Sequence, residues 1–221
     1  MKKLQLLTGS LLVCLAVSTA CKEEEYVYPD VITEFIDAGT DAEGSLQRLI
    51  TDNGKTLEIQ KRDGLDGLDA DTIYRTVSVY TLQDNNEAYL YSAQLVLSMI
   101  PVATDYFKDE IKTDLTDIRS IWQSGNYLNM ILTPLVKDQS HAFHFVNHGI
   151  TESNGKQILH LELYHDRNND LEAFSKEVYL SVPLWAYRNE LQQNDSVFFE
   201  INTYKQGKTV YKFLYPEIHT Y

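Results

Sequence analysis

Residues 72–82 have the sequence TIYRTVSVYTL, and this stretch decides the fold class. Two sets of side chains alternate along it: Ile73, Arg75, Val77 and Val79 against Tyr74, Thr76, Ser78 and Tyr80. Alternation with a period of two, in a run rich in β-branched and aromatic residues, is typical of a β-strand. The flanking sequence has the same character and is interrupted by short polar turns, so we predict an all-β protein.

The segment before this strand predicts a β-hairpin. Asn53-Gly54 separates the apolar segments 46–50 and 56–60, and Asn-Gly between such segments is a strong hairpin signal. Residues 88–102 form the next extended stretch, or a strand pair. About five strands therefore fall within residues 30–107, where they can close as a small OB-like barrel. The alternative is a single sheet that continues into the second half.

The second half predicts a β-sandwich of about seven short strands. These strands are expected at residues 118–122, 127–133, 143–146, 157–164, 178–182, 197–204 and 209–214. Turn signals such as Asn154-Gly155 and Gln206-Gly207 separate them at the spacing of a sandwich. The polar segment 105–117 marks the boundary, so we assign residues 108–221 to the sandwich domain.

The first twenty residues predict a lipoprotein signal peptide. A basic start and an apolar run at 4–17 lead through small residues to Cys21, which is the layout of a secretory signal. The order resembles a lipobox, with Ser18 where a leucine is usual. We expect residues 1–20 to be removed, a palmitate-type anchor on Cys21 to hold the protein to the membrane, and residues 21–29 to form a tether. The alternative is an ordinary secretory signal that ends near a cysteine.

The run Lys22-Glu23-Glu24-Glu25 directly follows this cysteine. A short lysine and acidic run in this place resembles the surface-export signal of Bacteroidota lipoproteins. The resemblance implies an outer-membrane location with the protein facing the cell exterior. More than one acyl chain would give firm anchoring. Cys14 is lost with the signal and Cys21 is acylated, so we expect no disulfide.

The overall charge argues against one class of partner. The chain has 32 Asp and Glu against 19 Lys and Arg, a net charge of −13. Such a chain repels phosphate backbones, so we expect no nucleic-acid partner. No second apolar run of about 18 residues follows the signal, so we predict no bilayer-spanning helix after it.

The chain resembles the NigD-like proteins, a family of Bacteroidota lipoproteins. The resemblance rests on three places: LITDNGKTL at 49–57, IRSIW at 118–122 with GNYLN at 125–129, and the closing hairpin from DSV at 195–197 to GKTVY at 207–211. It covers nearly the whole chain, and the order of the motifs is more telling than any one of them. It implies an N-terminal OB-type domain, a C-terminal β-sandwich and, through the family's name, a link to bacteriocin production. It supplies no catalytic residues.

Candidate catalytic and metal-ligating residues are few. His141, His144 and His148 could supply a metal site, but in a strand His141 would point away from the other two; we expect surface histidines. The acidic loop 63–71 lacks the spacing of a calcium loop, so we expect it to be solvated. The sequence contains no G-x-S-x-G and no glycine-rich phosphate loop. We predict no catalytic, cofactor-binding or metal-binding residues, no cofactor and no enzyme activity.

Aromatic residues indicate where a ligand could bind. Trp185 and Tyr187 follow Pro183 in a predicted loop and could form an exposed pair, whereas Trp122 is expected in the sandwich core. We interpret the chain as a non-catalytic binding or interaction module with an unknown protein or glycan partner. The alternatives are a glycan-binding accessory lipoprotein and, with less support, a hydrolase. An exposed, flat aromatic pair would favour a glycan, and a buried pair would favour a protein.

Overall fold

The computed structural model describes residues 30–108 and 110–219. The predicted signal peptide (1–20), Cys21 and the tether (21–29) lie outside these residues. In the described part of the chain, no helix is long and apolar enough to cross a membrane. Helix there is confined to short 3-10 turns: η1 (Asp84–Asn86), η2 (Thr104–Tyr106) and η3 (Leu184–Tyr187). Strands make up most of the rest, so the prediction of an all-β protein is confirmed.

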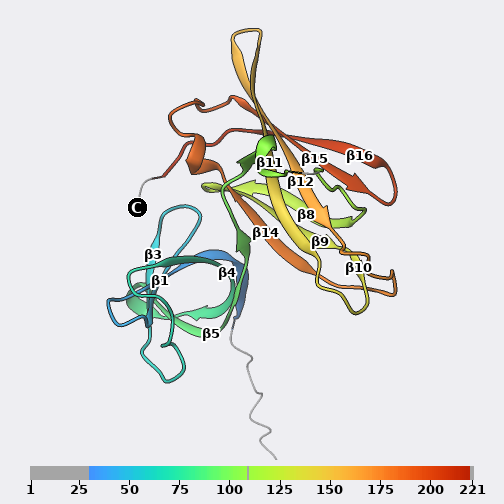
Figure 1. Ribbon diagram of the computed structural model, residues 1–221. Coiled ribbons are helices and arrows are strands. Elements are labelled where there is room, and N and C mark those ends of the chain that lie inside the picture. The colour runs from blue at the N-terminus through green and yellow to red at the C-terminus, as the bar shows by residue number, and fades with distance from the viewer. Residues whose placement is uncertain (1–29, 109, 220–221) are drawn as a thin grey trace, which may run out of the picture. The chain divides into compact units, whose positions relative to one another are not determined.

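The first five strands close into a barrel (Figure 1). They are β1 (Ile32–Thr40), β2 (Leu46–Ile50), β3 (Thr56–Ile59), β4 (Ile73–Leu82) and β5 (Glu87–Leu95). The order around the barrel is β1-β2-β3-β5-β4, and β4 pairs back onto β1. The β3–β5 pairing is parallel and the other pairings are antiparallel. This arrangement is the OB-type barrel that the sequence predicted, and apolar side chains such as Ile36, Leu49 and Leu90 form its core.

The β2–β3 hairpin forms where Asn53-Gly54 predicted it, but its connection is longer than a two-residue turn. The Thr51 N–H donates to the Lys55 carbonyl at 2.9 Å, and the Gly54 N–H donates to the Thr51 carbonyl at 2.8 Å. Of these loop residues only Gly54 has a positive φ, at 82°, whereas a two-residue type I′ turn needs two. In this longer loop, the Asp52 carboxylate accepts hydrogen bonds from Arg75 of β4.

The rest of the described chain forms the predicted β-sandwich. One sheet has the strand order β16-β15-β12-β11-β7, and the other has the order β6-β14-β9-β8. The strands are β6 (Leu97–Ser98), β7 (Val102–Ala103), β8 (Asp117–Ser124), β9 (Tyr127–Thr133), β11 (Ala142–Ser153), β12 (Lys156–Asp166), β14 (Val178–Pro183), β15 (Ser196–Thr203) and β16 (Gly207–Leu214). A small further sheet pairs β10 (Leu135–Val136) with β13 (Phe174–Ser175). All seven strands predicted for the sandwich are present, as β8, β9, β11, β12, β14, β15 and β16.

The sandwich begins earlier in the chain than the predicted boundary at residue 108. The strand pair β6 and β7 precedes that boundary, yet β6 pairs with β14 and β7 pairs with β11. Both pairings are parallel and join segments that are far apart in the sequence. An alternating pattern shows that a segment is extended, but it does not show which strand the segment pairs with. The extended stretch 88–102 therefore serves both domains: β5 closes the barrel, and the next residues add an edge to each sandwich sheet.

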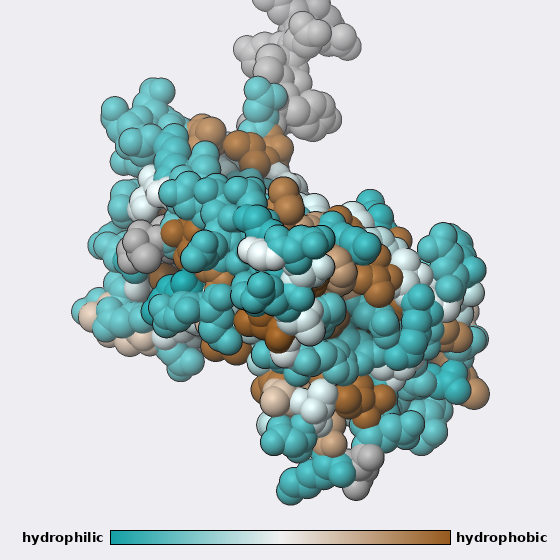
Figure 2. Space-filling view, turned by 90° about the horizontal axis from the view of Figure 1, so that it is seen from above, coloured by the Kyte–Doolittle hydropathy of each residue, from teal (hydrophilic) through white to brown (hydrophobic). Residues whose placement is uncertain are grey.

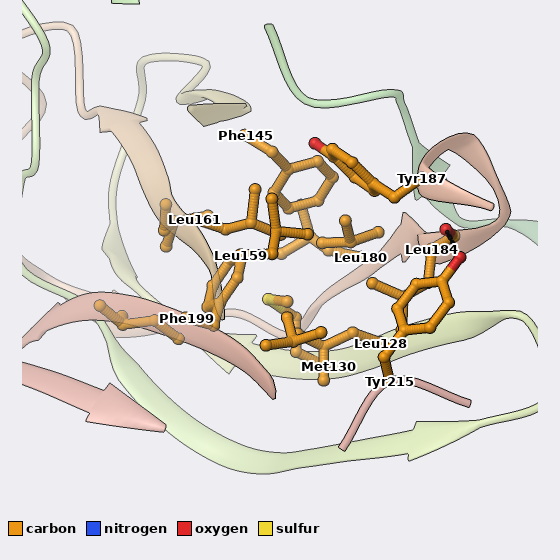
Figure 3. Close-up of a cluster of buried hydrophobic side chains, with 14 of the residues drawn as sticks. Leu128, Met130, Phe145, Leu159, Leu161, Leu180, Leu184, Tyr187, Phe199 and Tyr215 are labelled. Carbon is orange, nitrogen blue, oxygen red and sulfur yellow. Dashed lines mark hydrogen bonds between the residues drawn. The ribbon is translucent and has the colours of Figure 1, made fainter. Parts of the chain in front are cut away.

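The larger apolar core lies between the two sandwich sheets (Figure 3). Leu128 and Met130 of β9 meet Leu159 and Leu161 of β12, and Phe199 of β15 packs edge-to-face against Phe145 with ring centroids 6.1 Å apart. These side chains are at most 2% exposed. By contrast, the face in Figure 2 shows its apolar side chains in small groups separated by hydrophilic ones. Burial between the sheets therefore supplies the main stabilisation of the sandwich.

We predict that Phe199→Ala lowers the free energy of unfolding by about 3–5 kcal/mol, because it removes a fully buried ring and leaves a cavity. Urea denaturation followed by circular dichroism measures the change. The matched control is Phe174→Ala: Phe174 is 55% exposed, so its removal should change stability by no more than about 0.5 kcal/mol. Equal losses from the two variants would contradict the assignment of the core.

Candidate functional site

Strand β9 has two buried faces, because successive side chains of a strand point to opposite sides. Leu128, Met130 and Leu132 belong to the sandwich core. Tyr127 and Asn129 point to the other side and are also buried, at 8% and 0% exposed. Their hydrogen-bond partners are residues of the barrel and of β14. At Tyr127 and Asn129 the outer face of β9 therefore contacts the barrel through polar side chains.

Five residues form this contact, which we call the seam: Asp37, Asp52 and Arg75 of the barrel, and Tyr127 and Asn129 of β9. Arg75 Nη1 donates to Asp52 Oδ1 at 2.7 Å and to Asp37 Oδ1 at 3.2 Å. Nη2 donates to Asp52 Oδ2 and to Asn129 Oδ1, both at 3.1 Å. The guanidinium carbon lies 4.0 Å from the centroid of the Tyr127 ring, and the Tyr127 hydroxyl donates to Asp37 Oδ2 at 3.2 Å. One side chain of β4 thus joins β1, the β2–β3 loop and β9.

The seam holds two carboxylates against one guanidinium. The side chains of Arg75 and Asp37 are 1% and 2% exposed, and that of Asp52 is 17% exposed. Burial raises the pKa of Asp37, although Arg75 and the Tyr127 hydroxyl act in the opposite direction. Burial would lower the pKa of Arg75, but its contacts with Asp52 and Asp37 outweigh burial and raise it. Because Asp52 binds both terminal nitrogens of the guanidinium, Asp37 is the less compensated carboxylate.

Two buried donors of the seam have no partner among the described residues: Arg75 Nε and Asn129 Nδ2. Asn129 Oδ1 accepts from Arg75 and also from Ser181 Oγ at 2.6 Å, and these two donors fix the orientation of the amide. An unsatisfied buried donor costs about 1–3 kcal/mol. The seam therefore holds a defined geometry at some cost in stability.

Two turns also pack closely at the seam. Gly125, in the turn between β8 and β9, has a φ of 51°, and a Cβ at this position would lie 2.6 Å from the Asp52 carbonyl oxygen. A side chain cannot fit at that distance. Glycine is therefore required here both for the turn and for the approach of the β2–β3 loop.

A hollow of about 590 Å³ borders the seam beside Arg75 and Tyr127. We call it the Trp185 hollow, and its apolar lining includes Ile73, Leu95, Leu97, Ile100 and Trp185. Leu95 is 61% exposed and Ile100 is 50% exposed. The volume is within the range of ligand-binding pockets, and clustered exposed apolar side chains mark interaction sites.

The exposed pair of Trp185 and Tyr187 predicted from the sequence does not form. Tyr187 is 4% exposed, and its ring lies in the sandwich core with Phe145 (Figure 3). The two residues belong to η3, where side chains three residues apart share a face, so Tyr187 follows Leu184 into the core. Trp185 is half-buried and lines the hollow. Only Trp185 of the predicted pair is therefore placed to contact a ligand.

A second hollow, of about 530 Å³, lies where β1 and β4 of the barrel meet β8 and β14. We call it the Trp122 hollow. Trp122 was expected in the core, but it is half-buried and packs edge-to-face against Phe35 of β1, with ring centroids 5.0 Å apart. Its neighbour Ile121 packs against the sandwich core instead. A β-bulge between Ile118 and Ser120 interrupts the alternation of β8, so a period of two counted from Ile118 places Trp122 on the wrong face.

The three histidines considered as metal ligands do not converge. His141 Nδ1 lies 2.9 Å from His165 Nε2, whereas His148 Nε2 lies 2.8 Å from Glu162 Oε2, and His144 packs against Tyr106. The described residues contain no group of three or more His, Cys, Asp or Glu side chains placed to hold a metal ion, the acidic loop 63–71 included. These histidines instead take part in hydrogen bonds and aromatic contacts.

The fold and the seam define a class of two-domain β-proteins in which an OB-type barrel is fixed to the outer face of a β-sandwich. Residues 98–215 match the model of the NigD-like C-terminal β-sandwich domain. A NigD-like immunity protein from Bacteroides caccae is 32% identical; the match covers 85% of this chain and 94% of that one, with a TM-score of 0.69. The chain belongs to the NigD-like family.

More distant structures share the fold. A protein of unknown function from Bacteroides vulgatus is 21% identical, with a TM-score of 0.66 and coverage of 85% of this chain and 92% of that one. A candidate lipoprotein from Bacteroides fragilis is 13% identical, with a TM-score of 0.63 and coverage of 86% and 100%. At these identities the likeness concerns the fold alone. No protein with a curated description matches the chain.

We predict that Arg75→Met lowers the free energy of unfolding by about 3–5 kcal/mol, because it leaves buried Asp37 without its cation. The loss should shrink as the pH falls from about 8 to about 5, since protonation of Asp37, whose pKa burial already raises, removes the uncompensated charge. Guanidinium denaturation over this pH range measures both effects.

The double variant Arg75→Met/Asp37→Asn is the control, because it removes the stranded charge along with the guanidinium. It should recover part of the lost stability and lose the pH dependence. A loss of less than about 1 kcal/mol in the single variant, the size expected of an exposed ion pair, would show that the seam does not depend on Arg75.

Proposed function

We propose that this chain is a non-catalytic, lipid-anchored binding protein of the outer membrane, facing the cell exterior, and that it contacts a protein partner through the Trp185 hollow. The observation that carries the proposal is the group of exposed aliphatic side chains around Trp185. Ile73, Leu95, Leu97 and Ile100 are each at least 36% exposed and line one hollow. Aliphatic side chains grouped on a rigid surface match the core of a protein–protein interface.

The chemistry of this hollow favours a protein over a glycan. The exposed side chains of its lining are aliphatic, whereas the aromatic ones, Tyr74, Tyr127 and Trp185, are half-buried or buried. Aliphatic side chains lack the flat face on which a sugar ring stacks. The relative from Bacteroides caccae is named an immunity protein. A role of that kind, exercised through contact with another protein, fits the hollow.

A non-catalytic role is supported by the pairing of the buried ionisable groups. Arg75 is held by two carboxylates. Glu162 accepts from Lys208 at 2.9 Å and lies 2.8 Å from His148. Asp170 accepts from backbone N–H groups, which hold its pKa below the usual range even though burial acts to raise it. Each of these groups has a structural partner, and catalytic groups are usually poised for a substrate.

The anchor rests on sequence and on one distant relative. Cys21 follows an apolar run and small residues, and an acidic run follows it. The Bacteroides fragilis protein that shares the fold is described as a candidate lipoprotein. An anchor at residue 21 would precede β1, which begins at Ile32.

We expect a photo-crosslinking amino acid at Leu95 to capture a defined protein partner in intact cells, because Leu95 projects from the hollow. Adding Ile100→Asp should lower the adduct yield about tenfold, since a carboxylate opposes burial of an apolar anchor. The matched control is Leu171, which is 63% exposed and does not line the hollow: Leu171→Asp should leave the yield unchanged. A yield that is insensitive to Ile100→Asp would contradict the assignment of the hollow.

We also expect the wild-type protein to incorporate labelled palmitate and to sediment with membranes, and Cys21→Ser to lose both properties. Cys14→Ser is the matched control, because Cys14 lies in the predicted signal peptide, so it should behave like the wild type. Protease treatment of intact cells tests the orientation: a protein that faces outward is digested. Label retained by Cys21→Ser would refute the anchor, and full protection from protease would refute the outward orientation.

A further inference from the structure

The Trp122 hollow has an aromatic and apolar floor. Phe35, Val77, Trp122, Ile131 and Tyr179 come from five different strands and line it together. Phe35 meets Trp122 at an interplanar angle of 85° and Tyr179 at 71°. Among the described residues, neither Trp122 nor Tyr179 has a stacked aromatic partner, and both are half-buried. The floor therefore presents aromatic rings that a flat ligand can cover.

The rim of the same hollow is polar. It carries the hydroxyls of Thr33, Ser120 and Ser124, the carboxylates of Glu34, Asp52 and Glu177, and the guanidinium of Arg119. Arg119 pairs with Glu177, which also accepts from the Tyr179 hydroxyl at 2.8 Å. Glu34 Oε1 accepts from Tyr80 at 2.7 Å. These bonds fix the rim in place, while carboxylate oxygens retain lone pairs for further donors.

From this combination we infer that the Trp122 hollow is a carbohydrate-binding site. A sugar ring has an apolar C–H face and a periphery of hydroxyl groups. The face can stack on Trp122 and Tyr179, and the hydroxyl groups can donate to the rim carboxylates and accept from Arg119. The volume of about 530 Å³ is within the range of small-ligand pockets.

The charge of the rim selects among sugars. Asp52 is paired with Arg75 and Glu177 with Arg119. Glu34 is thus the rim carboxylate that forms no ion pair among the described residues. A uronic acid would place its negative charge beside Glu34 in a site with no free cation on its rim, and like charges this close repel. The ligand is therefore a neutral sugar.

This site is independent of the proposed protein contact, because the two hollows have no lining residue in common. It also moves the glycan-binding surface from Trp185 and Tyr187, where the sequence placed it, to the outer face of β8 and β14.

The two tryptophans of the chain give a direct test in the full-length mature protein. In Trp185→Phe the only indole is Trp122, so stacking of a sugar should shift its fluorescence saturably. In Trp122→Phe a ring still lines the floor, but the remaining indole lies in the other hollow, so no shift is expected. The probes are maltohexaose, cellohexaose, mannohexaose and xylohexaose, with oligogalacturonate as the charged control.

We expect at least one neutral probe to shift the fluorescence of Trp185→Phe at millimolar concentration or below, and oligogalacturonate to give no shift. Adding Tyr179→Ala should weaken binding about tenfold, with circular dichroism to verify folding. The inference is overturned if no neutral probe gives a saturable shift up to about 10 mM, roughly ten times the millimolar dissociation constant expected. It is equally overturned if oligogalacturonate binds as well as the neutral probes, or if Trp122→Phe shows the same shift. None of these outcomes bears on the crosslinking at Leu95.

Discussion

The structure depends on the guanidinium of Arg75, which sits between two carboxylates of the barrel and an amide of the sandwich. It binds Asp52 through both terminal nitrogens and Asp37 through one of them, and it reaches Asn129 of β9. An apolar contact is non-directional and tolerates sliding, whereas a planar donor fork with fixed partners does not. A buried charge also costs several kcal/mol unless it is paired. These bonds therefore fix the barrel in one orientation on the sandwich sheet.

The two hollows form because the barrel is held in this orientation on the sandwich. Arg75 and Tyr127 line the Trp185 hollow, and Asp52 lines the Trp122 hollow. Each hollow also takes residues from both domains, so neither domain could form either hollow alone. The two differ in chemistry: the first exposes aliphatic side chains, and the second has aromatic rings within a charged rim. The junction of the barrel and the sandwich thus forms two separate hollows.

The sequence predicted the elements well and the side-chain directions less well. The OB-type barrel and all seven sandwich strands were predictable because alternation and turn residues are local signals. Asn53-Gly54 correctly placed its hairpin, although not the length of the loop. Tyr187 was misplaced because a single 3-10 turn decides which of two neighbouring aromatic side chains enters the core. Arg75 lies in the strand from which the fold class was predicted, but its hydrogen-bond partners lie 23 to 54 residues away in the sequence. Its role in the seam was therefore not predictable from local sequence.

The sequence by itself determined the β architecture and its order, because a period of two and the conformations of Asn and Gly are properties of neighbouring residues. It also predicts a lipid anchor at Cys21, and this prediction rests on local composition. Only the tertiary structure decided where the domains meet and which aromatic residues are accessible. The tertiary structure also decided that short strands such as β6 pair with the sandwich sheets. These features depend on contacts between residues that are far apart in the sequence, such as an ion pair or the pairing of an edge strand. A local sequence pattern does not identify the partner in such a contact.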